Sequence, residues 1–168
     1  AFRNTQSPLL YGGAALVAML HDVVIVLGIF SILGVLFNVR VDALFITALL
    51  TVIGFSVHDT IVVFDRIREN LALNPAESFE SVVDHSLAQT VVRSLNTSMT
   101  VVFTLLALVL FGGDSTRVFV LALLLGTISG TYSSIFNASQ LLVAWENGEI
   151  QSLFRRLTRR ETAQTAGA

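Results

Sequence analysis

The sequence predicts an all-α membrane protein, a polytopic bundle of four transmembrane helices. Of its 168 residues, 54% are hydrophobic and only 13% are charged, and its mean hydropathy is +0.76, whereas soluble domains carry about 25% charged residues. Four continuous apolar runs are long enough to cross a bilayer core of about 30 Å, which takes roughly 20 helical residues. The runs do not alternate, and an open sheet would leave backbone groups unpaired in lipid, so helices are expected.

The order of these runs divides the chain into five segments. We expect, in order, residues 1–10 as the end of a preceding helix or a linker, 11–64 as the first two transmembrane helices (11–37 and 43–64), 65–90 as a connection, 91–145 as the last two transmembrane helices (91–111 and 118–145), and 146–168 as a basic tail. The chain opens AFRNTQSP, without an initiator Met or a secretory signal. We therefore expect it to be part of a longer protein.

The connection 65–90 contains a pattern typical of a helix start. Asn74, Pro75 and Glu77 match an N-cap, a first-turn proline and an acidic third position. An amphipathic helix over about 75–90 is expected to follow and to lie at the membrane surface or under the bundle.

The distribution of arginines predicts how the chain is oriented in the membrane. The two ends and the connection 65–90 carry seven of them, Arg3, Arg66, Arg68, Arg155, Arg156, Arg159 and Arg160. The two opposite connections carry only Arg40 and Arg117. Because positive charge concentrates in cytoplasmic segments, both ends are expected in the cytoplasm.

Composition also excludes several kinds of site. A net charge of −2 gives no support for nucleic-acid binding. The chain has no cysteine, which excludes disulfides, thiol chemistry and cysteine-based metal sites. We expect neither a cofactor nor a metal ion.

The run 54-GFSVHDTIVVFDRIREN-70 places His58 and Asp59 inside an apolar segment. An Asp at membrane depth costs about 2.5–3.5 kcal/mol even on a mild insertion scale, so it needs a partner or a hydrated cavity. Steps of four place Thr47, Thr51 and Phe55 on the face of Asp59, and that face is expected to look into the bundle. The alternative is that Asp59 lies near the interface and is simply solvated.

Arg93 begins a polar stripe through Thr97, Thr100 and Thr104 in the third expected span. A guanidinium beside Asp59 would favour the ionised carboxylate, and a helix shift that separated the two would favour protonation. A proton-binding switch is the resulting hypothesis. The alternative is that Arg93 anchors the helix at the interface with a snorkelling side chain.

His21 and Asp22 lie about ten residues into the first expected span. Adjacent helical residues point about 100° apart, so one should face a neighbouring helix and the other a cavity. An imidazole can carry protons near neutral pH. The alternative is a hydrogen bond between helices.

The last expected span contains 126-GTISGTYSS-134. Gly126 and Gly130 form a small-xxx-small pattern, which lets helices pack closely. Close packing is therefore the expected role of these glycines, with Thr127, Thr131 and Ser134 beside them.

Four blocks of the sequence resemble the SecF family of the SecD–SecF protein-export pair. The run GFSVHDTIVVFDRIREN is similar to a family signature that typically reads G-Y-S-x-N-D-T-(I/V)-V-V-F-D-R-I-R-E-N. The other blocks, in the family's order, are ALVAMLHDVVIVLGIFS (15–31), VVRSLNTSMTVVFTLLALVLFGG (91–113) and GTYSSIFNASQLLVAW (130–145).

The resemblance implies an RND-type fold, in which the four helices are the third to sixth of a six-helix repeat. That repeat would pair with a homologous SecD half, in a separate or a fused chain. It implies a translocase component of a bacterial or archaeal plasma (inner) membrane, not an enzyme. This component would use the proton-motive force to help pull exported polypeptide from the SecYEG channel, with YajC as a further partner.

The matching positions place proton passage at Asp59 and Arg93. The residues expected to tune or extend the proton path are His58, Thr97, Thr100, Asp22 and His21. In two places the chain departs from the family pattern. His58 replaces the usual Asn, and Asn137 and Gln140 replace an apolar residue and a Pro, which should make the last helix more polar and straighter.

Three alternatives remain at this point. The chain could belong to another RND-type exporter, or serve as a membrane scaffold without proton chemistry. Asp22 and Asp59 could also form the dyad of an intramembrane aspartyl protease, because two carboxylates sharing a proton are sound chemistry. The run GFSVHD lacks the G-x-G-D pattern of those proteases, which weighs against that reading.

Overall fold

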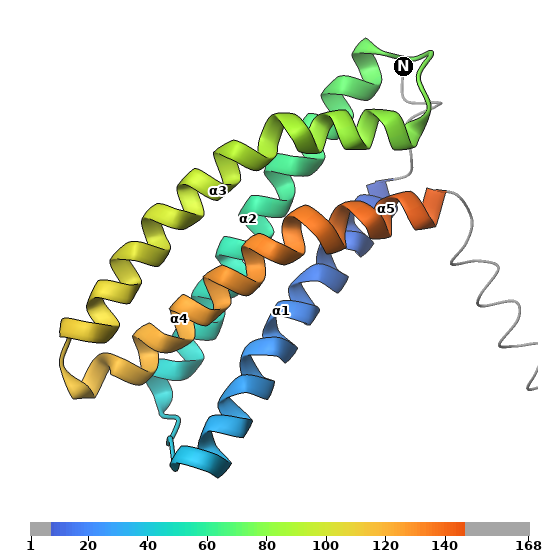
Figure 1. Ribbon diagram of the computed structural model, residues 1–168. Helices are drawn as coiled ribbons and strands as arrows, with labels where there is room; N and C mark the ends of the chain where they lie inside the picture. The colour runs from blue at the N-terminus through green and yellow to red at the C-terminus, as the bar shows by residue number, and fades with distance from the viewer. Residues whose placement is uncertain (1–7, 147–168) are drawn as a thin grey trace, which may run out of the picture.

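The computed structural model describes residues 8–146, which form a bundle of long helices (Figure 1). The elements in chain order are α1 (Pro8–Phe37), α2 (Ala43–Leu73), α3 (Phe79–Phe111), α4 (Asp114–Tyr132), the π-helical turn η2 (Ser133–Asn137) and α5 (Ala138–Glu146). The predicted all-α bundle is confirmed over these residues. The start of α1, the end of α5 and the α2–α3 connection lie at one end of the bundle, and the α1–α2 and α3–α4 connections lie at the other.

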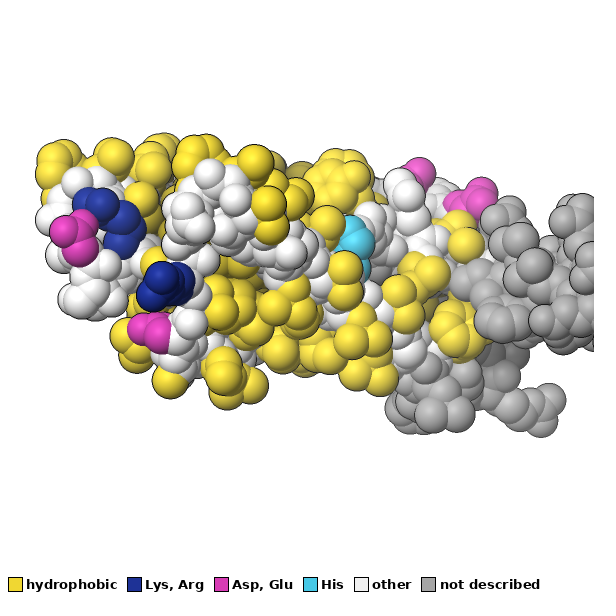
Figure 2. All heavy atoms as spheres, turned by 90° about the horizontal axis from the view of Figure 1, so that it is seen from below, with side chains coloured by type: hydrophobic (Ala, Val, Ile, Leu, Met, Phe, Trp, Pro, Cys, Tyr) yellow, Lys and Arg dark blue, Asp and Glu magenta, His cyan; other side chains and the backbone are white. Residues whose placement is uncertain are grey.

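Four segments are long and apolar enough to cross a membrane. They are Leu10–Phe37, Ala43–Leu73, Phe79–Phe111 and Asp114–Glu146, the last of which runs through α4, η2 and α5. The exterior carries many large apolar side chains, such as Val35 and Phe111, which are 81% and 88% exposed. Figure 2 shows this surface as largely hydrophobic, with charged side chains gathered toward its ends. Such a surface suits contact with lipid or with further helices.

The connection between α2 and α3 differs from the prediction. Asn74 ends α2, with its N–H donated to the carbonyl of Asn70 at 2.9 Å. Ser78, not Asn74, is the N-cap of α3, and its hydroxyl accepts from the N–H of Ser81 at 3.3 Å. The predicted N-cap and the separate helix over 75–90 are therefore wrong. Pro75 suits the position just after a helix end as well as a helix start, and α3 then continues unbroken into the membrane span.

The turns of α2 and α3 that extend beyond the predicted spans are joined by polar contacts. Arg66 Nε donates to Gln89 Oε1 at 2.5 Å, and Asn70 Nδ2 donates to Ser86 Oγ at 2.8 Å. Asn70 is only 4% exposed. These bonds hold the two helices together where the apolar runs end.

The core consists of apolar clusters with a polar layer between two of them. One cluster, near the described chain ends, includes Ala14, Ile67 and Leu142. A second, nearer the α1–α2 and α3–α4 connections, includes Phe30 and Phe45, whose rings lie 4.7 Å apart, and Ala122. A layer of buried polar residues lies between these clusters along α1, α2 and α4–η2; it includes Asp22, Ser56, Asp59, Thr60, Ser133 and Ser134.

Gly126 and Gly130 lie where α4 crosses α2. A Cβ on Gly126 would overlap the side chain of Val52. A Cβ on Gly130 would lie 3.3 Å from the Cβ of Ser56. The two glycines let α4 approach α2 closely, and this approach brings the following η2 turn against the polar layer.

Candidate functional site

Asp22 is held by side chains from three other segments of the fold. Its Oδ2 accepts hydrogen bonds from Ser56 Oγ of α2 at 2.5 Å and from Ser133 Oγ of η2 at 2.6 Å. Its Oδ1 accepts from Ser129 Oγ of α4 at 2.9 Å and lies 3.2 Å from His21 Nδ1. Asp22 is 1% exposed. Four contacts on two oxygens nearly fill the acceptor capacity of a carboxylate.

Asp59 forms a second buried carboxylate site one helical turn beyond Ser56 on α2. Its Oδ1 accepts from Ser94 Oγ of α3 at 2.9 Å, and its Oδ2 accepts from Ser134 Oγ of η2 at 2.6 Å. Asp59 is 9% exposed. It is the seventeenth residue of a 31-residue helix, so the carboxylate lies near the middle of α2. It has fewer partners than Asp22 and is less completely enclosed.

The π-helical turn η2 places consecutive serines on different carboxylates. Ser133 reaches Asp22 on α1, and Ser134 reaches Asp59 on α2. A π turn is wider than an α turn, is rare, and is frequently found at functional sites. It interrupts the last span, so this span is not a regular α-helix throughout.

Arg93 does not pair with Asp59, which corrects the expected ion pair. Within residues 8–146 the contacts found between basic and acidic side chains are His21–Asp22, Arg66–Glu69 and Arg117–Asp114, and none involves Arg93. Arg93, the residue before Ser94, is exposed. It lines a surface groove of about 380 Å³ together with Asp65, Arg66 and Glu69. Because neighbouring helical residues point about 100° apart, Ser94 rather than Arg93 faces Asp59.

The predicted threonine stripes also face outward. Thr97, Thr100 and Thr104 of α3 are exposed, and their hydroxyls donate to backbone carbonyls four residues earlier at 2.9–3.0 Å. Thr47 and Thr51 of α2 are exposed in the same way. A threonine can satisfy its hydroxyl within its own helix, so a polar stripe need not face the core.

The inward stripe of α3 was missed in the sequence. It consists of Ser86, Thr90, Ser94 and Ser98, all buried and spaced by four. Ser98 accepts a hydrogen bond from Thr131 Oγ1 of α4 at 2.7 Å. The signal that identifies this stripe is the regular spacing of small hydroxyl residues, which allow close helix approach and still donate a hydrogen bond.

The two histidines of the hypothesis differ in position. His58 is exposed on α2. His21 lines a groove of about 360 Å³ between α1 and α5, and its Nε2 lies 3.3 Å from Nδ2 of Asn137. An imidazole that donates from Nδ1 to Asp22 and accepts at Nε2 from Asn137 satisfies both contacts.

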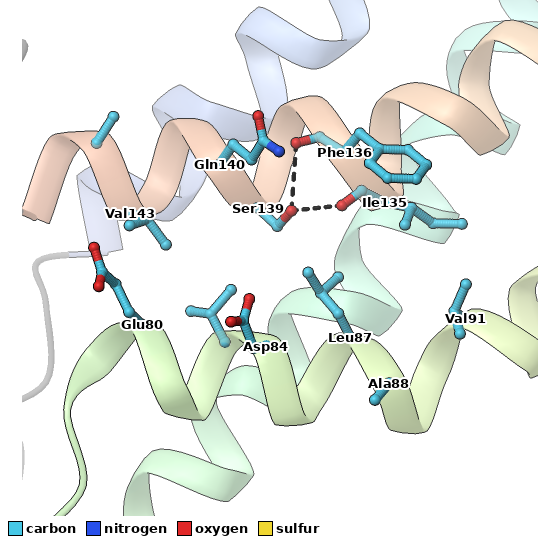
Figure 3. Close-up of a pocket in the computed structure, with 12 residues that line it drawn as sticks. Glu80, Asp84, Leu87, Ala88, Val91, Ile135, Phe136, Ser139, Gln140 and Val143 are labelled. Atoms are coloured by element: carbon cyan, nitrogen blue, oxygen red, sulfur yellow. Dashed lines mark hydrogen bonds between the residues drawn. The ribbon is translucent and has the colours of Figure 1, made fainter.

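A larger groove lies between α3 and the last span. It has a volume of about 720 Å³ and is lined mainly by apolar side chains, with Glu80 and Asp84 on its α3 side (Figure 3). On the opposite wall the hydroxyl of Ser139 donates to the carbonyls of Ile135 and Phe136 in its own helix. Neither Asp22 nor Asp59 lines this groove.

Residues 8–148 match the family described as protein export membrane protein SecD/SecF, C-terminal. The chain belongs to the SecD/SecF family. It is 66% identical to the protein translocase subunit SecF of Thermobaculum terrenum over 98% of this chain, and 54% identical to that of Anaerolinea thermophila over 93%. These matches cover 52% and 51% of the two relatives, so the chain spans about half of their length.

Solved structures of the SecD/SecF family have the same fold. A crystal structure of SecDF in a super-membrane-facing form matches with a TM-score of 0.76 and 40% identity over 95% of this chain and 20% of that chain. A second, of SecDF, a translocon-associated membrane protein from Thermus thermophilus, gives a TM-score of 0.78 and 43% identity over 83% and 19%. The present SecD/SecF chain is thus a multi-pass membrane protein with a SecDF-like helical bundle.

The protease alternative loses its support in this SecD/SecF chain. Asp22 and Asp59 have separate sets of serine partners, and none of the hydrogen bonds found in residues 8–146 joins the two carboxylates. A protease dyad needs two carboxylates that share one proton.

Proposed function

We propose that this chain is the membrane part of a SecF-type translocase subunit that uses the proton-motive force in Sec-dependent protein export. The observation that carries the proposal is Asp59, a buried carboxylate near the middle of a membrane helix. Its two observed partners are the neutral hydroxyls of Ser94 and Ser134. Ionisable groups at this depth are costly, and they mark proton paths in many membrane proteins.

Asp59 would bind and release the transported proton. An ionised carboxylate only accepts hydrogen bonds, whereas a protonated one also donates. Proton uptake would therefore displace one serine hydroxyl. Ser134 has a second acceptor ready, because its Oγ lies 3.2 Å from the carbonyl of Thr131. A proton could in this way change a contact between α2 and η2.

Arg93 would act as the alternate counter-charge of Asp59. It adjoins Ser94 on α3. A turn of α3 by about 100° would replace the Ser94 hydroxyl by the Arg93 guanidinium, which would favour release of the proton. His58, Thr97 and Thr100 on the outer faces would hydrate the site in that state, while Asp22 and His21 extend the path.

The membrane potential supplies enough energy for such a change. One charge crossing 100 mV is worth about 2.3 kcal/mol. This energy shifts a two-state equilibrium about forty- to fifty-fold. We propose that the shift is passed to parts of the protein outside this chain, which would act on exported polypeptide.

The family supports the proposed partners, and the arginines support the proposed orientation. The relatives are named protein translocase subunits SecF and SecDF, so SecD, the SecYEG translocon and YajC are the proposed partners. The seven arginines near the two ends and the α2–α3 connection favour a cytoplasmic location for that side of the inner membrane.

The test uses the full-length parent protein in inverted membrane vesicles. Asp59→Asn should abolish proton conductance and the stimulation of late-stage protein export by the proton-motive force, because the amide cannot carry the proton. Arg93→Gln should lower both at least tenfold. The matched control is Asp84→Asn, which neutralises an exposed carboxylate on α3 away from the site and should leave both unchanged.

Intact export in Asp59→Asn would exclude the proton mechanism even though the family membership stands. Export that is lost equally in Asp84→Asn would mean that any loss of negative charge is harmful, and the assignment of Asp59 would fail.

A further inference from the structure

The two buried carboxylates meet the same short turn of the chain. Ser133 and Ser134 are consecutive residues of η2, and each bonds a carboxylate of a different helix at 2.6 Å. Both serines are fully buried. No other described segment bonds both Asp22 and Asp59 through adjacent residues.

The geometry points to Asp22 as a positioning residue that acts on Asp59 through the π turn. We propose that the bond between Ser133 and Asp22 anchors η2, and that this anchor aims Ser134 at Asp59. The inference rests on the proposed role of Asp59 and deepens it, because it names the element that sets how readily Asp59 takes up a proton.

The hydrogen bonds of the turn show why it needs an anchor. A π turn is less favourable than an α turn, so tertiary contacts must hold it. Each serine also has an acceptor within its own helix, the carbonyl of Gly130 for Ser133 at 3.3 Å and that of Thr131 for Ser134 at 3.2 Å. A hydroxyl has one proton to donate, so each serine chooses between its helix and a carboxylate.

Asp22 is the fixed member of this arrangement. It accepts from three hydroxyls and contacts His21, and it is 1% exposed. Asp59 accepts from two hydroxyls and is 9% exposed. Loss of the anchor should let Ser133 turn to Gly130, relax the turn and withdraw Ser134 from Asp59.

The other ionisable groups described on the elements around Asp59 face outward or contact other partners. His58 on its own helix is exposed, and Arg93 on α3 lines the surface groove with Asp65 and Arg66. His21 on α1 contacts Asp22 and Asn137. Asp59 bonds η2 and α3 through the hydroxyls of Ser134 and Ser94. A change in η2 should therefore alter the hydrogen bonding of Asp59 directly.

The experiment follows the carboxylic-acid infrared band of Asp59 during a pH titration of the purified full-length protein. The band is assigned by its loss in Asp59→Asn. Ser134→Ala removes a bond to the charged form and should move the midpoint of the band to higher pH by about one unit. Ser133→Ala, which does not touch Asp59, should move it in the same direction by a smaller but measurable amount.

Ser86→Ala is the matched control. Ser86 is a buried serine of α3 whose hydroxyl donates to the carbonyl of Val82 and accepts from Asn70, and it contacts neither η2 nor a carboxylate. Its removal should leave the midpoint unchanged. If Ser133→Ala and Ser86→Ala give the same midpoint, Asp22 does not act through the turn and the inference is overturned.

A second variant covers the case in which Ser133→Ala does not fold. Ser133→Cys keeps the size of the side chain and the charge of Asp22 but replaces the hydroxyl by a much weaker donor, and it should also raise the midpoint of the Asp59 band. An unchanged midpoint would overturn the inference. The infrared midpoint is measured without any export assay. If the midpoint does not change but Asp59→Asn abolishes export, the anchoring role of Asp22 is rejected and the proposed function stands. Intact export in Asp59→Asn would reject the proposed function instead.

Discussion

At the scale of single residues, the bundle satisfies its buried polar groups mainly with hydroxyls. Asp22 and Asp59 together accept from five serine side chains on α2, α3, α4 and η2. A serine hydroxyl can donate a hydrogen bond to a carboxylate, accept one from a protonated carboxyl group, or donate to a backbone carbonyl of its own helix. Such contacts let a carboxylate change its protonation without leaving a buried charge unpaired.

Thr60 is an exception to this pattern. Its Oγ1 is the single buried side-chain oxygen or nitrogen in residues 8–146 that lacks a hydrogen-bond partner there. Thr60→Val keeps the shape and removes the unpaired hydroxyl, so the stability of the full-length protein should be unchanged or rise by up to about 1 kcal/mol. Thermal unfolding in detergent measures the change.

Thr131→Val is the matched control for Thr60→Val. Thr131 is also buried, but its hydroxyl bonds Ser98 of α3 at 2.7 Å, and its loss should lower stability by about 1 kcal/mol. An equal loss in Thr60→Val would show that the Thr60 hydroxyl has a partner elsewhere in the full protein.

At the scale of elements, the contact between α2 and α4 decides where the polar layer forms. Gly126 lets Val52 of α2 lie against the backbone of α4, and Gly130 does the same for Ser56. The η2 turn starts three residues after Gly130. A wider separation of α2 and α4 would carry Ser134 away from Asp59.

Gly126→Ala should therefore destabilise the bundle by about 1–3 kcal/mol, because a methyl group there overlaps Val52. The control Gly28→Ala places a methyl group in open space on α1 and should be neutral or slightly stabilising. Unfolding of the full-length protein gives both values.

Adding Val52→Ala to Gly126→Ala should recover part of the lost stability, since the smaller side chain leaves room for the methyl group. If Gly126→Ala is as well tolerated as Gly28→Ala, the close approach of α2 and α4 is not required for stability.

At the scale of the whole molecule, charged side chains lie toward both ends of the bundle, and the two ends carry different segments of the chain (Figure 2). The extended α2–α3 hairpin lies at the same end as the start of α1 and the end of α5 (Figure 1). The groove between α1 and α5 runs from His21, near the middle of α1, toward this end, so the proposed proton path would open to the cytoplasm here.

Single introduced cysteines can test the proposed orientation of the chain in the membrane, because the chain contains no cysteine. In a full-length protein otherwise free of cysteine, Ala76→Cys in the α2–α3 connection should react with an impermeant maleimide only from the cytoplasmic side. Ser115→Cys at the start of α4 should react only from the opposite side. Both positions are exposed. The reverse labelling pattern would overturn the arginine-based orientation.

The amino-acid sequence was enough to predict the helical class, the four spans and the two acidic residues that needed partners. Long apolar runs and isolated carboxylates constrain a chain in lipid whatever its neighbours are. The partners themselves depend on how the helices pack. Arg93 and Ser94 are adjacent in sequence, and a rotation of about 100° separates the one that faces solvent or lipid from the one that reaches Asp59.

The π turn is the clearest case of a feature set by tertiary packing. Its residues, SSIFN, carry no local signal for a wider helix. The turn exists where the close crossing of α2 and α4 brings two carboxylates within reach of consecutive serines. Hydrogen bonds between segments more than 70 residues apart depend on how the helices cross, which helical periodicity alone does not fix.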